Sequence, residues 1–447
     1  MTARLKSLGA LAVLTVLSVP VAVAVAAAVV RRATGVEEPA RPSGRTVLLT
    51  GGKMTKSLQL ARMFAALGDR VIVGETAKYR YCGTRFSRAV DRFVVLPDFG
   101  DDGEDYADAL LDVVLEEGVD LFVPVASPAA AHFDALAKPR LAQHTEVFHF
   151  DADVVDMLDD KFAFCERCHD YGLSAPEVHR IESPTTLLNF VWPAGKRYVL
   201  KSIAYDPVYR LDLRTLPHPG WQDRVRALPI SAQQPWVLQE FVEGREVCTH
   251  STVRDGEVML YICCDSSPFQ VNYDMLDLPD VYEWVSTFLR KLGGTGQASF
   301  DFIVQSDGQV MPIECNPRTH SAITLFHDQL EGAQAYYAAG EPGAKQWRPH
   351  TSTRPTYWLY HELWRWVCTW RPAQSAVVQG ASRHDRHVIW SRVWQGKEAV
   401  FRWDDPLPFL FINHVQIPML LVGSLLQDQG WERIDFNIGK LVTAGGD

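Results

Sequence analysis

The sequence lacks an excess of basic residues. Lysine and arginine together number 44 against 54 aspartates and glutamates, which gives a formal net charge of −10. A protein that binds nucleic acid needs clustered positive charge to meet a phosphate backbone. Nucleic acid is therefore excluded as the expected partner. The 47% hydrophobic and 22% charged composition is that of a globular chain, and 447 residues predict two or three domains.

Paired cysteine spacing is also missing. The eight cysteines are scattered, and we expect them to be reduced, as in a cytosolic protein. Cys165 and Cys168, followed by His169, match a c-type haem attachment pattern. They lie inside a segment with helical spacing, which favours packing or surface thiols over haem attachment.

A classical P-loop is absent as well. Gly51, Gly52 and Lys53 follow a strand-like segment, but Val47 stands where the first glycine of that motif belongs and Met54 where Ser or Thr belongs. Two interpretations stay open for this glycine turn. It is a plain tight turn, or its amides contact an anionic acceptor substrate at the start of the next helix.

One long apolar run stands near the beginning of the chain. Leu8 to Val30 contains no charged residue and has basic residues on both sides. At about 1.5 Å per residue it is long enough to cross a bilayer of about 30 Å. We expect a retained membrane anchor. A cleaved signal peptide is the alternative, because Ala22 to Ala24 resembles a cleavage site.

Strands alternate with helices after this run, which predicts a parallel sheet. Expected strands are 46–50, 71–73, 93–96 and 121–125, with helices at 55–67 and 106–117. Further on, helices are expected at 153–158, from 159 to 169 or 171, and at 279–292, and strands at 198–202, 235–242, 247–253 and 258–263. Near the end, 356–366 and 413–426 are helix-like and 434–441 is strand-like. The segment 413–426 is too short to span a membrane, so we expect it to pack on the protein or lie at a membrane surface.

The most informative stretch is a predicted β-hairpin over 301–316, with its turn at Asp307-Gly308. Glu314 and Asn316 are two residues apart and share a face, and Asp301 can face the same side from the partner strand. Hard oxygen ligands of this kind suit Mg²⁺, which leaves other positions to water and phosphate. An ordinary hairpin with a solvated acidic face is the alternative.

The order of several charged residues over about 151–330 resembles the ATP-grasp superfamily. The residues that carry the resemblance are Lys161, Lys201, Gln239, Glu240, Glu246, Asp301, Glu314, Asn316 and Arg318. The resemblance implies an α/β chain: an N-terminal parallel-sheet domain, then an ATP-grasp α+β domain, preceded by a transmembrane-like helix. The implied layout is 1–32 anchor, 33–45 linker, 46–150 N-terminal α/β domain, 151–340 catalytic domain, and 341–447 an aromatic-rich region packing on it.

The resemblance also implies the roles of residues, with ATP and Mg²⁺ as cofactors. The implied catalytic residues are Arg318 and Lys201, and the implied metal ligands are Asp301, Glu314 and Asn316. The implied ATP contacts are Lys161, Lys201, Gln239, Glu240, Phe241, Val242 and Glu246. Substrate contacts are expected from Thr319, His320, Ser321, Arg210, Gly52 and Lys53. The loop after Lys201 departs from the glycine-rich lid of many such enzymes.

Within the superfamily, the chain resembles the mycosporine-glycine synthase family along nearly its full length. The segments that carry this resemblance are 51–56, 147–153, 157–162, 248–256, 314–324 and 434–442. It implies joining of glycine to 4-deoxygadusol at the expense of ATP, by a membrane-anchored enzyme whose catalytic part faces the cytoplasm. Two alternatives stay open: a ligase for another acid and amine, such as an amino-acid ligase, and a nucleotide-binding scaffold without turnover. Clustered carboxylates without a metal repel each other, which disfavours the scaffold.

Overall fold

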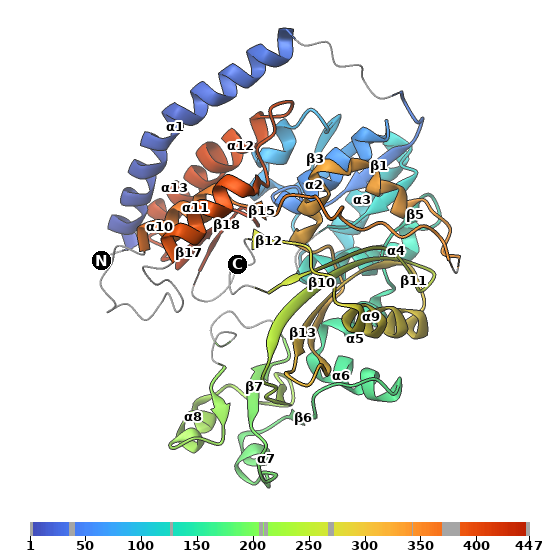
Figure 1. Cartoon of the computed structure of the whole chain (residues 1–447), viewed down its shortest axis with the longest axis vertical. Coiled ribbons are helices and arrows are strands. Elements are labelled where there is room, and N and C mark those ends of the chain that lie inside the picture. Colours follow the sequence, from blue (N-terminus) through green and yellow to red (C-terminus); the bar gives the residue numbers. More distant parts are fainter. Residues whose placement is uncertain are drawn as a thin grey trace.

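A computed structural model describes residues 3–34, 41–125, 128–204, 209, 213–266, 272–341, 343–368 and 385–443. Arg210, one of the expected substrate contacts, lies outside the described residues. Figure 1 shows the N-terminal sheet and its helices on one side of the two sheets of the following region, with the C-terminal helices beside them.

The first unit is a parallel sheet in the order β3-β2-β1-β4-β5. Its strands are β1 (Thr46–Leu49), β2 (Arg70–Thr76), β3 (Arg92–Leu96), β4 (Leu121–Val123) and β5 (Glu146–Val147). Its helices are α2 (Thr55–Ala66), η1 (Ala77–Tyr79), η2 (Gly83–Phe86), α3 (Glu104–Glu117) and α4 (Pro128–Leu141). Every residue of β1 and β4 is buried, as in a sheet covered on both faces. The predicted parallel sheet is confirmed; α4 and β5 are additions to it.

A small antiparallel sheet comes next, in the order β6-β9-β7-β8. Its elements are α5 (Ala152–Asp159), α6 (Lys161–Asp170), β6 (Val178–Ile181), α7 (Pro184–Leu188), β7 (Tyr198–Ser202), β8 (Thr215–Leu216), α8 (Trp221–Ala227) and β9 (Trp236–Glu240), of which α5 and α6 precede the sheet. Helices α7 and α8 cover it with a small core of its own that includes Trp221 and Trp236.

A second antiparallel sheet has the order β11-β10-β13-β14. Its elements are β10 (Arg245–Arg254), β11 (Glu257–Asp265), α9 (Pro279–Leu292), β13 (Gly296–Val304) and β14 (Val310–Asn316), followed by the 3-10 helices η3 (Ser321–Asp328) and η4 (Leu330–Tyr336). Phe164 of α6, Trp284 and Phe288 of α9 and Phe300 of β13 share one core cluster on this sheet. Cys165 and Cys168 of α6 are buried free thiols, so the packing interpretation of the cysteine pair is confirmed.

The region after residue 341 packs on both preceding parts. Trp347, Trp358 and Phe409 belong to the same core cluster as Val47 of β1 and Leu260 of β11. Its elements are β15 (Thr356–Tyr357), α10 (Leu359–Cys368), α11 (Asp385–Gln395), β16 (Lys397–Glu398), α12 (Leu407–Phe411), η5 (Ile412–Gln416), α13 (Ile417–Leu426), β17 (Arg433–Asp435) and β18 (Lys440–Val442). The earlier strand β12 (Asn272–Tyr273) pairs with β15. The predicted helix at 356–366 was wrong at its start, because its first two residues pair as β15.

The predicted single strand at 434–441 was also wrong. The segment is a tight hairpin in which Asp435 pairs with Lys440 and Gly439 adopts a left-handed φ of +71°. The carboxylate of Asp435 accepts hydrogen bonds from the backbone N–H groups of Asn437 and Ile438, at 3.1 and 3.0 Å. An aspartate that caps its own turn in this way reverses the chain within a few residues.

The apolar N-terminal run forms one helix, α1 (Ala3–Thr34), which lies along α12, η5 and α13 (Figure 1). Two helical segments are long and apolar enough to cross a membrane by length and composition, Arg4–Arg32 and Leu407–Leu426. The second joins α12, η5 and α13 into one run, so it is longer than the predicted 413–426. Polar contacts tie α1 to the protein: the Trp431 indole donates to Ser7 Oγ at 2.9 Å, and Lys6 Nζ donates to the Trp431 carbonyl at 2.7 Å.

Candidate active site

The hairpin of β13 and β14 brings the three expected metal ligands to one face. Asp301 pairs directly with Glu314, and Ser299 pairs with Asn316. Directly opposed residues of an antiparallel pair share a face, so both carboxylates and the amide point the same way. The Asn316 amide nitrogen lies 3.4 Å from Asp301 Oδ2. The register shifts at Asp301 and Phe302, so the ladder is irregular next to this carboxylate, a device often found near active sites.

The charges on this face are not balanced by the hairpin itself. Burial raises the pKa of Asp301 to about 8, and the nearby carboxylates of Glu314 and Glu246 act in the same direction. A divalent cation would stabilise the ionised form of this carboxylate. The donor set of two carboxylates and one amide oxygen therefore fits Mg²⁺. Among the described residues, no group of three His, Cys, Asp or Glu side chains could hold a metal ion, so other oxygens would complete the coordination.

Two lysines converge on Glu314 from different elements. Lys161 is the first residue of α6, whose N-cap Asp160 accepts from the backbone N–H of Phe162 at 2.8 Å. Its Nζ lies 3.8 Å from Glu314 Oε1. Lys201 stands on β7, and burial lowers its pKa while the charge of Glu314 raises it and that of Lys161 lowers it. The site therefore alternates positive and negative charge over a short distance.

Gln239 holds Lys201 in place. Lys201 Nζ donates to Gln239 Oε1 at 2.8 Å, and the Gln239 amide donates to the Ile313 carbonyl of β14 at 3.1 Å. The backbone of Gln239 pairs with β6 on one side and β7 on the other. The backbone of Gln239 is therefore used within the sheet, and an ATP contact from this residue would have to come from its side chain. That side chain connects the small sheet to the hairpin.

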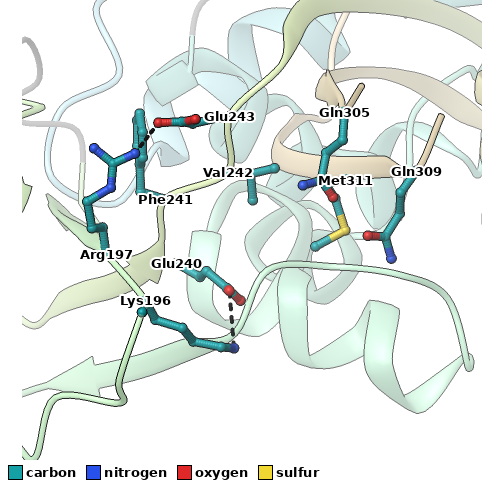
Figure 2. Close-up of a pocket in the computed structure, with 10 residues that line it drawn as sticks. Lys196, Arg197, Glu240, Phe241, Val242, Glu243, Gln305, Gln309 and Met311 are labelled. Atoms are coloured by element: carbon teal, nitrogen blue, oxygen red, sulfur yellow. Dashed lines mark hydrogen bonds and ion pairs between the residues drawn. The ribbon is translucent and has the colours of Figure 1, made fainter. Parts of the chain in front are cut away.

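A cavity of about 490 Å³ lies at the junction of the two sheets, within the size range of small-molecule sites. Glu240 at the end of β9 and Phe241, Val242 and Glu243 in the link to β10 form part of its lining. The rest is Gly195, Lys196, Arg197, Gln305, Gln309 and Met311 (Figure 2).

Ion pairs shape the side of this cavity next to the link. Lys196 Nζ lies 3.1 Å from Glu240 Oε1, and the Arg197 guanidinium lies over the Phe241 ring at 4.9 Å. Phe241 N–H donates to the Arg197 carbonyl at 2.7 Å, so this amide is also engaged. Glu246, at the start of β10, is exposed and accepts from Ser266 Oγ at 2.6 Å.

Arg318 continues the site beyond the hairpin. Its guanidinium donates to Asp159 Oδ1 at 3.1 Å and also to the Asn316 amide oxygen. Asp159 ends α5, so Arg318 is held between that helix and the β14 end. In this position the guanidinium is next to one of the three expected metal ligands, where a phosphate would lie if the hairpin holds a metal.

The expected substrate residues meet where two helices begin. Thr319, His320 and Ser321 form the start of η3, with His320 as its N-cap. Lys56 Nζ, from the first turn of α2, donates to the Thr319 carbonyl at 2.6 Å. Sequence reasoning assigned no role to Lys56, although it closes the Gly51–Lys56 segment. Lys53 points elsewhere: its ammonium lies 4.2 Å from the Tyr79 ring centroid.

The hairpin of β17 and β18 completes this junction. Asn437 Oδ1 accepts from Thr55 Oγ1 at 2.6 Å, and its amide donates to Ser321 Oγ at 2.8 Å. A Cβ on Gly52 would lie 2.8 Å from Val73 Cγ1, so glycine is needed there by close packing. Asn437 was not expected to contribute. It links the start of η3, 116 residues before it, with the start of α2, 382 residues before it.

Several solved structures are similar to this chain in fold. An ADP complex of an N5-carboxyaminoimidazole ribonucleotide synthetase matches with a TM-score of 0.56 and 12% identity, covering 80% of this chain and 97% of that one. The N5-carboxyaminoimidazole synthetase of Staphylococcus aureus matches with a TM-score of 0.54 and 14% identity, over 72% and 83% of the two chains. A biotin carboxylase ATP-analogue complex from Campylobacter jejuni gives 0.52 and 12%, over 66% and 72%.

These likenesses show the fold alone. It is the ATP-grasp fold with an N-terminal parallel-sheet unit, as expected, preceded by an apolar helix. No family model matches the chain, and no curated protein matches it.

Proposed function

We propose that this protein is an ATP-dependent ligase of the ATP-grasp kind that forms a carbon–nitrogen bond and uses Mg²⁺. The observation that carries the proposal is the convergence of Lys161 and Lys201 on Glu314, on the face that also presents Asp301 and Asn316. This arrangement suits a polyphosphate: cations neutralise its charge while oxygen ligands hold the metal. The ATP-grasp fold and the cavity at the link between β9 and β10 support it.

In this proposal the nucleotide base occupies the cavity and the phosphates extend toward the hairpin. Glu240 to Val242 line the base, and Glu246 takes the ribose hydroxyls. Asp301, Glu314 and Asn316 would hold Mg²⁺, which when bound neutralises charge on the outer phosphates. Lys161 and Lys201 contact phosphate oxygens. Arg318 stabilises the phosphoryl group in transfer, and its bonds to Asp159 and Asn316 hold the guanidinium in position.

The proposed substrates are glycine and 4-deoxygadusol. The enol oxygen of the ring attacks the terminal phosphorus of ATP, and ADP leaves. This converts a poor leaving group into a good one. The neutral glycine amine then adds at the same ring carbon, the carbon–oxygen bond breaks, phosphate departs, and the nitrogen loses one proton to give an enaminone that keeps one N–H. The residues of this chain position the reactants and balance charge.

We also propose that α1 attaches the enzyme to a membrane, with the catalytic part in the cytoplasm. Val16, Val19 and Val23 of this helix are 72%, 66% and 66% exposed, which leaves an apolar face away from the protein. The full chain should sediment with membranes after a high-salt wash and be released by detergent. Replacing Val16 and Val23 by aspartate should move it to the soluble fraction. Recovery of the unaltered chain in the soluble fraction would contradict the attachment.

The decisive test is incubation of the full chain with ATP, Mg²⁺, glycine and 4-deoxygadusol. The expected result is free phosphate and an ultraviolet absorber shifted from that of the ring substrate. Glu314→Gln should reduce phosphate release by a factor of 10² or more, because it removes a charged metal ligand. The control is Glu283→Gln, an exposed glutamate on α9. Phosphate release with another amino acid but not with glycine would support a ligase for a different acid and amine.

A further inference from the structure

Two buried histidines lie between the hairpin sheet and η3. His250 stands on β10 with no exposed surface, and His320 at the N-cap of η3 is 9% exposed. His250 Nδ1 accepts from the backbone N–H of His320 at 3.3 Å, and His320 Nδ1 accepts from the backbone N–H of Ala322 at 3.3 Å. A nitrogen that accepts carries no proton. In the neutral ring the proton therefore sits on the other nitrogen, Nε2.

Each histidine thus presents an Nε2–H donor. Neither Nε2 has a hydrogen-bond partner in the part of the chain that the structure describes, and both atoms are buried. Burial lowers the pKa of both rings, which keeps them neutral and fixes this tautomer. A buried donor without an acceptor is costly to a fold, so two such donors on neighbouring residues call for an external acceptor.

The charges around these donors define what that acceptor must be. Lys56 is buried, which lowers its pKa well below the usual value, and the charge of its protonated form acts on both histidine rings. Arg318 adds its charge at His320 and Lys56. Lys56 uses one proton on the Thr319 carbonyl and has others to donate. Among the described residues, the charges that act on His250, His320 and Lys56 come from Lys53, Lys56, Arg318 and the histidines themselves, and none is a carboxylate. An oxygen-bearing anion fits this environment.

We propose that His250, His320 and Lys56 bind a carboxylate-type anion that belongs to a substrate other than ATP. The inference rests on the proposed function, which needs two such groups: the carboxylate of glycine and the ring enolate of 4-deoxygadusol, a vinylogous carboxylate. The site adjoins the proposed phosphoryl-transfer face through Arg318, which donates to Asn316 and whose positive charge also acts on His320. An anion held there lies next to the group that ATP would donate.

The test measures binding directly on the wild-type full chain labelled with ¹⁵N-histidine. Glycine, 4-deoxygadusol and acetate are added separately, and the Nε2 resonances of His250 and His320 are followed. We expect one of the two substrates to shift both resonances, which identifies the source of the anion, and acetate to shift them weakly. Unchanged resonances with all three probes would overturn the inference.

Kinetics supply the second measurement. His250→Phe should raise the KM of the bound substrate about tenfold or more, while the KM for ATP stays within about twofold, since the Nε2–H donor and its charge-assisted hydrogen bond are lost. His144→Phe, at an exposed histidine, is the matched control. Shifted resonances in a protein without ligase turnover would refute the proposed function and keep the anion site. Turnover with unshifted resonances would support the proposed function and overturn the anion site.

Discussion

A buried ion pair joins the N-terminal unit to the C-terminal region, and its removal gives the sharpest stability prediction. Arg62 of α2 donates from Nε to Asp405 Oδ2 at 2.9 Å, and each side chain is only 4% exposed. The guanidinium also donates to the Val400 carbonyl at 2.8 Å. Asp405 further accepts from Ser87 Oγ at 2.6 Å and the Arg88 N–H at 3.0 Å. Both charges depend on these contacts because little water reaches them.

Asp405→Asn leaves the Arg62 cation buried without its counter-charge. Breaking a buried pair from one side typically costs about 3–5 kcal/mol, and we expect a loss of that size in the free energy of unfolding. Asp404→Asn is the matched control, since Asp404 is a third exposed and pairs with the partly exposed Arg402. A loss under about 1 kcal/mol is expected there. The double replacement Arg62→Met with Asp405→Leu should recover part of the loss, because no isolated charge remains.

The assay is equilibrium urea unfolding of the full chain followed by tryptophan fluorescence, with the three variants compared at one pH and salt concentration. Equal losses in Asp405→Asn and Asp404→Asn would refute the reasoning. Such a result would mean that water reaches Arg62 and that the joint between the two regions is open.

Three other changes have expected outcomes. Burial lowers the pKa of His149 from its usual value to about 4, so the unfolded chain binds this proton at a higher pH than the folded chain does. The free energy of unfolding should therefore fall by about 2 kcal/mol from pH 7 to pH 5 through this group. In His149→Gln, the urea midpoints at the two pH values should lack the difference that this loss causes. Gly439→Ala should lower the free energy of unfolding by about 1–3 kcal/mol, because φ is +71° and a Cβ would lie 2.3 Å from the Lys53 carbonyl oxygen. Gly430→Ala is the control, since a Cβ there meets nothing within 4 Å. Equal urea midpoints of the two variants would contradict this prediction. Lys201→Met should cut phosphate release by about 10²–10³ by removing a cation from the phosphate path; an unchanged rate would exclude Lys201 from it.

Local patterns predicted the elements that carry their own signal. The helix at 279–292 begins with Pro279 and ends before Gly293, and the structure has these bounds. The hairpin was predictable because alternation puts Glu314 and Asn316 on one face and Asp307-Gly308 marks the turn. Short or weakly patterned elements were missed: α4 contains an internal proline, and β5 and β6 are two and four residues long.

The contact between the start of α2 and the start of η3 had no local signal in the sequence. Lys56 and Thr319 are 263 positions apart, and nothing in either segment indicates the other. The same holds for Asn437, whose segment was predicted as one extended strand because its apolar residues alternate. Its Asp435 turn chemistry reversed the chain instead. Sequence reasoning therefore brought Asp301, Glu314 and Asn316 to one face, because one hairpin builds it. It named His320 but not Lys56 beside it, because segments far apart in the chain assemble that cluster.

The contact between Asn437 and Thr55 has a consequence for how the protein becomes active during synthesis. The glycine turn at 51–53 and the first turn of α2 emerge early from the ribosome, but the partner that fixes them is made 382 residues later. A chain still lacking 433–442 has the start of α2 without this hydrogen-bond partner. If the proposed function holds, the ligase activity begins only once this late hairpin is in place.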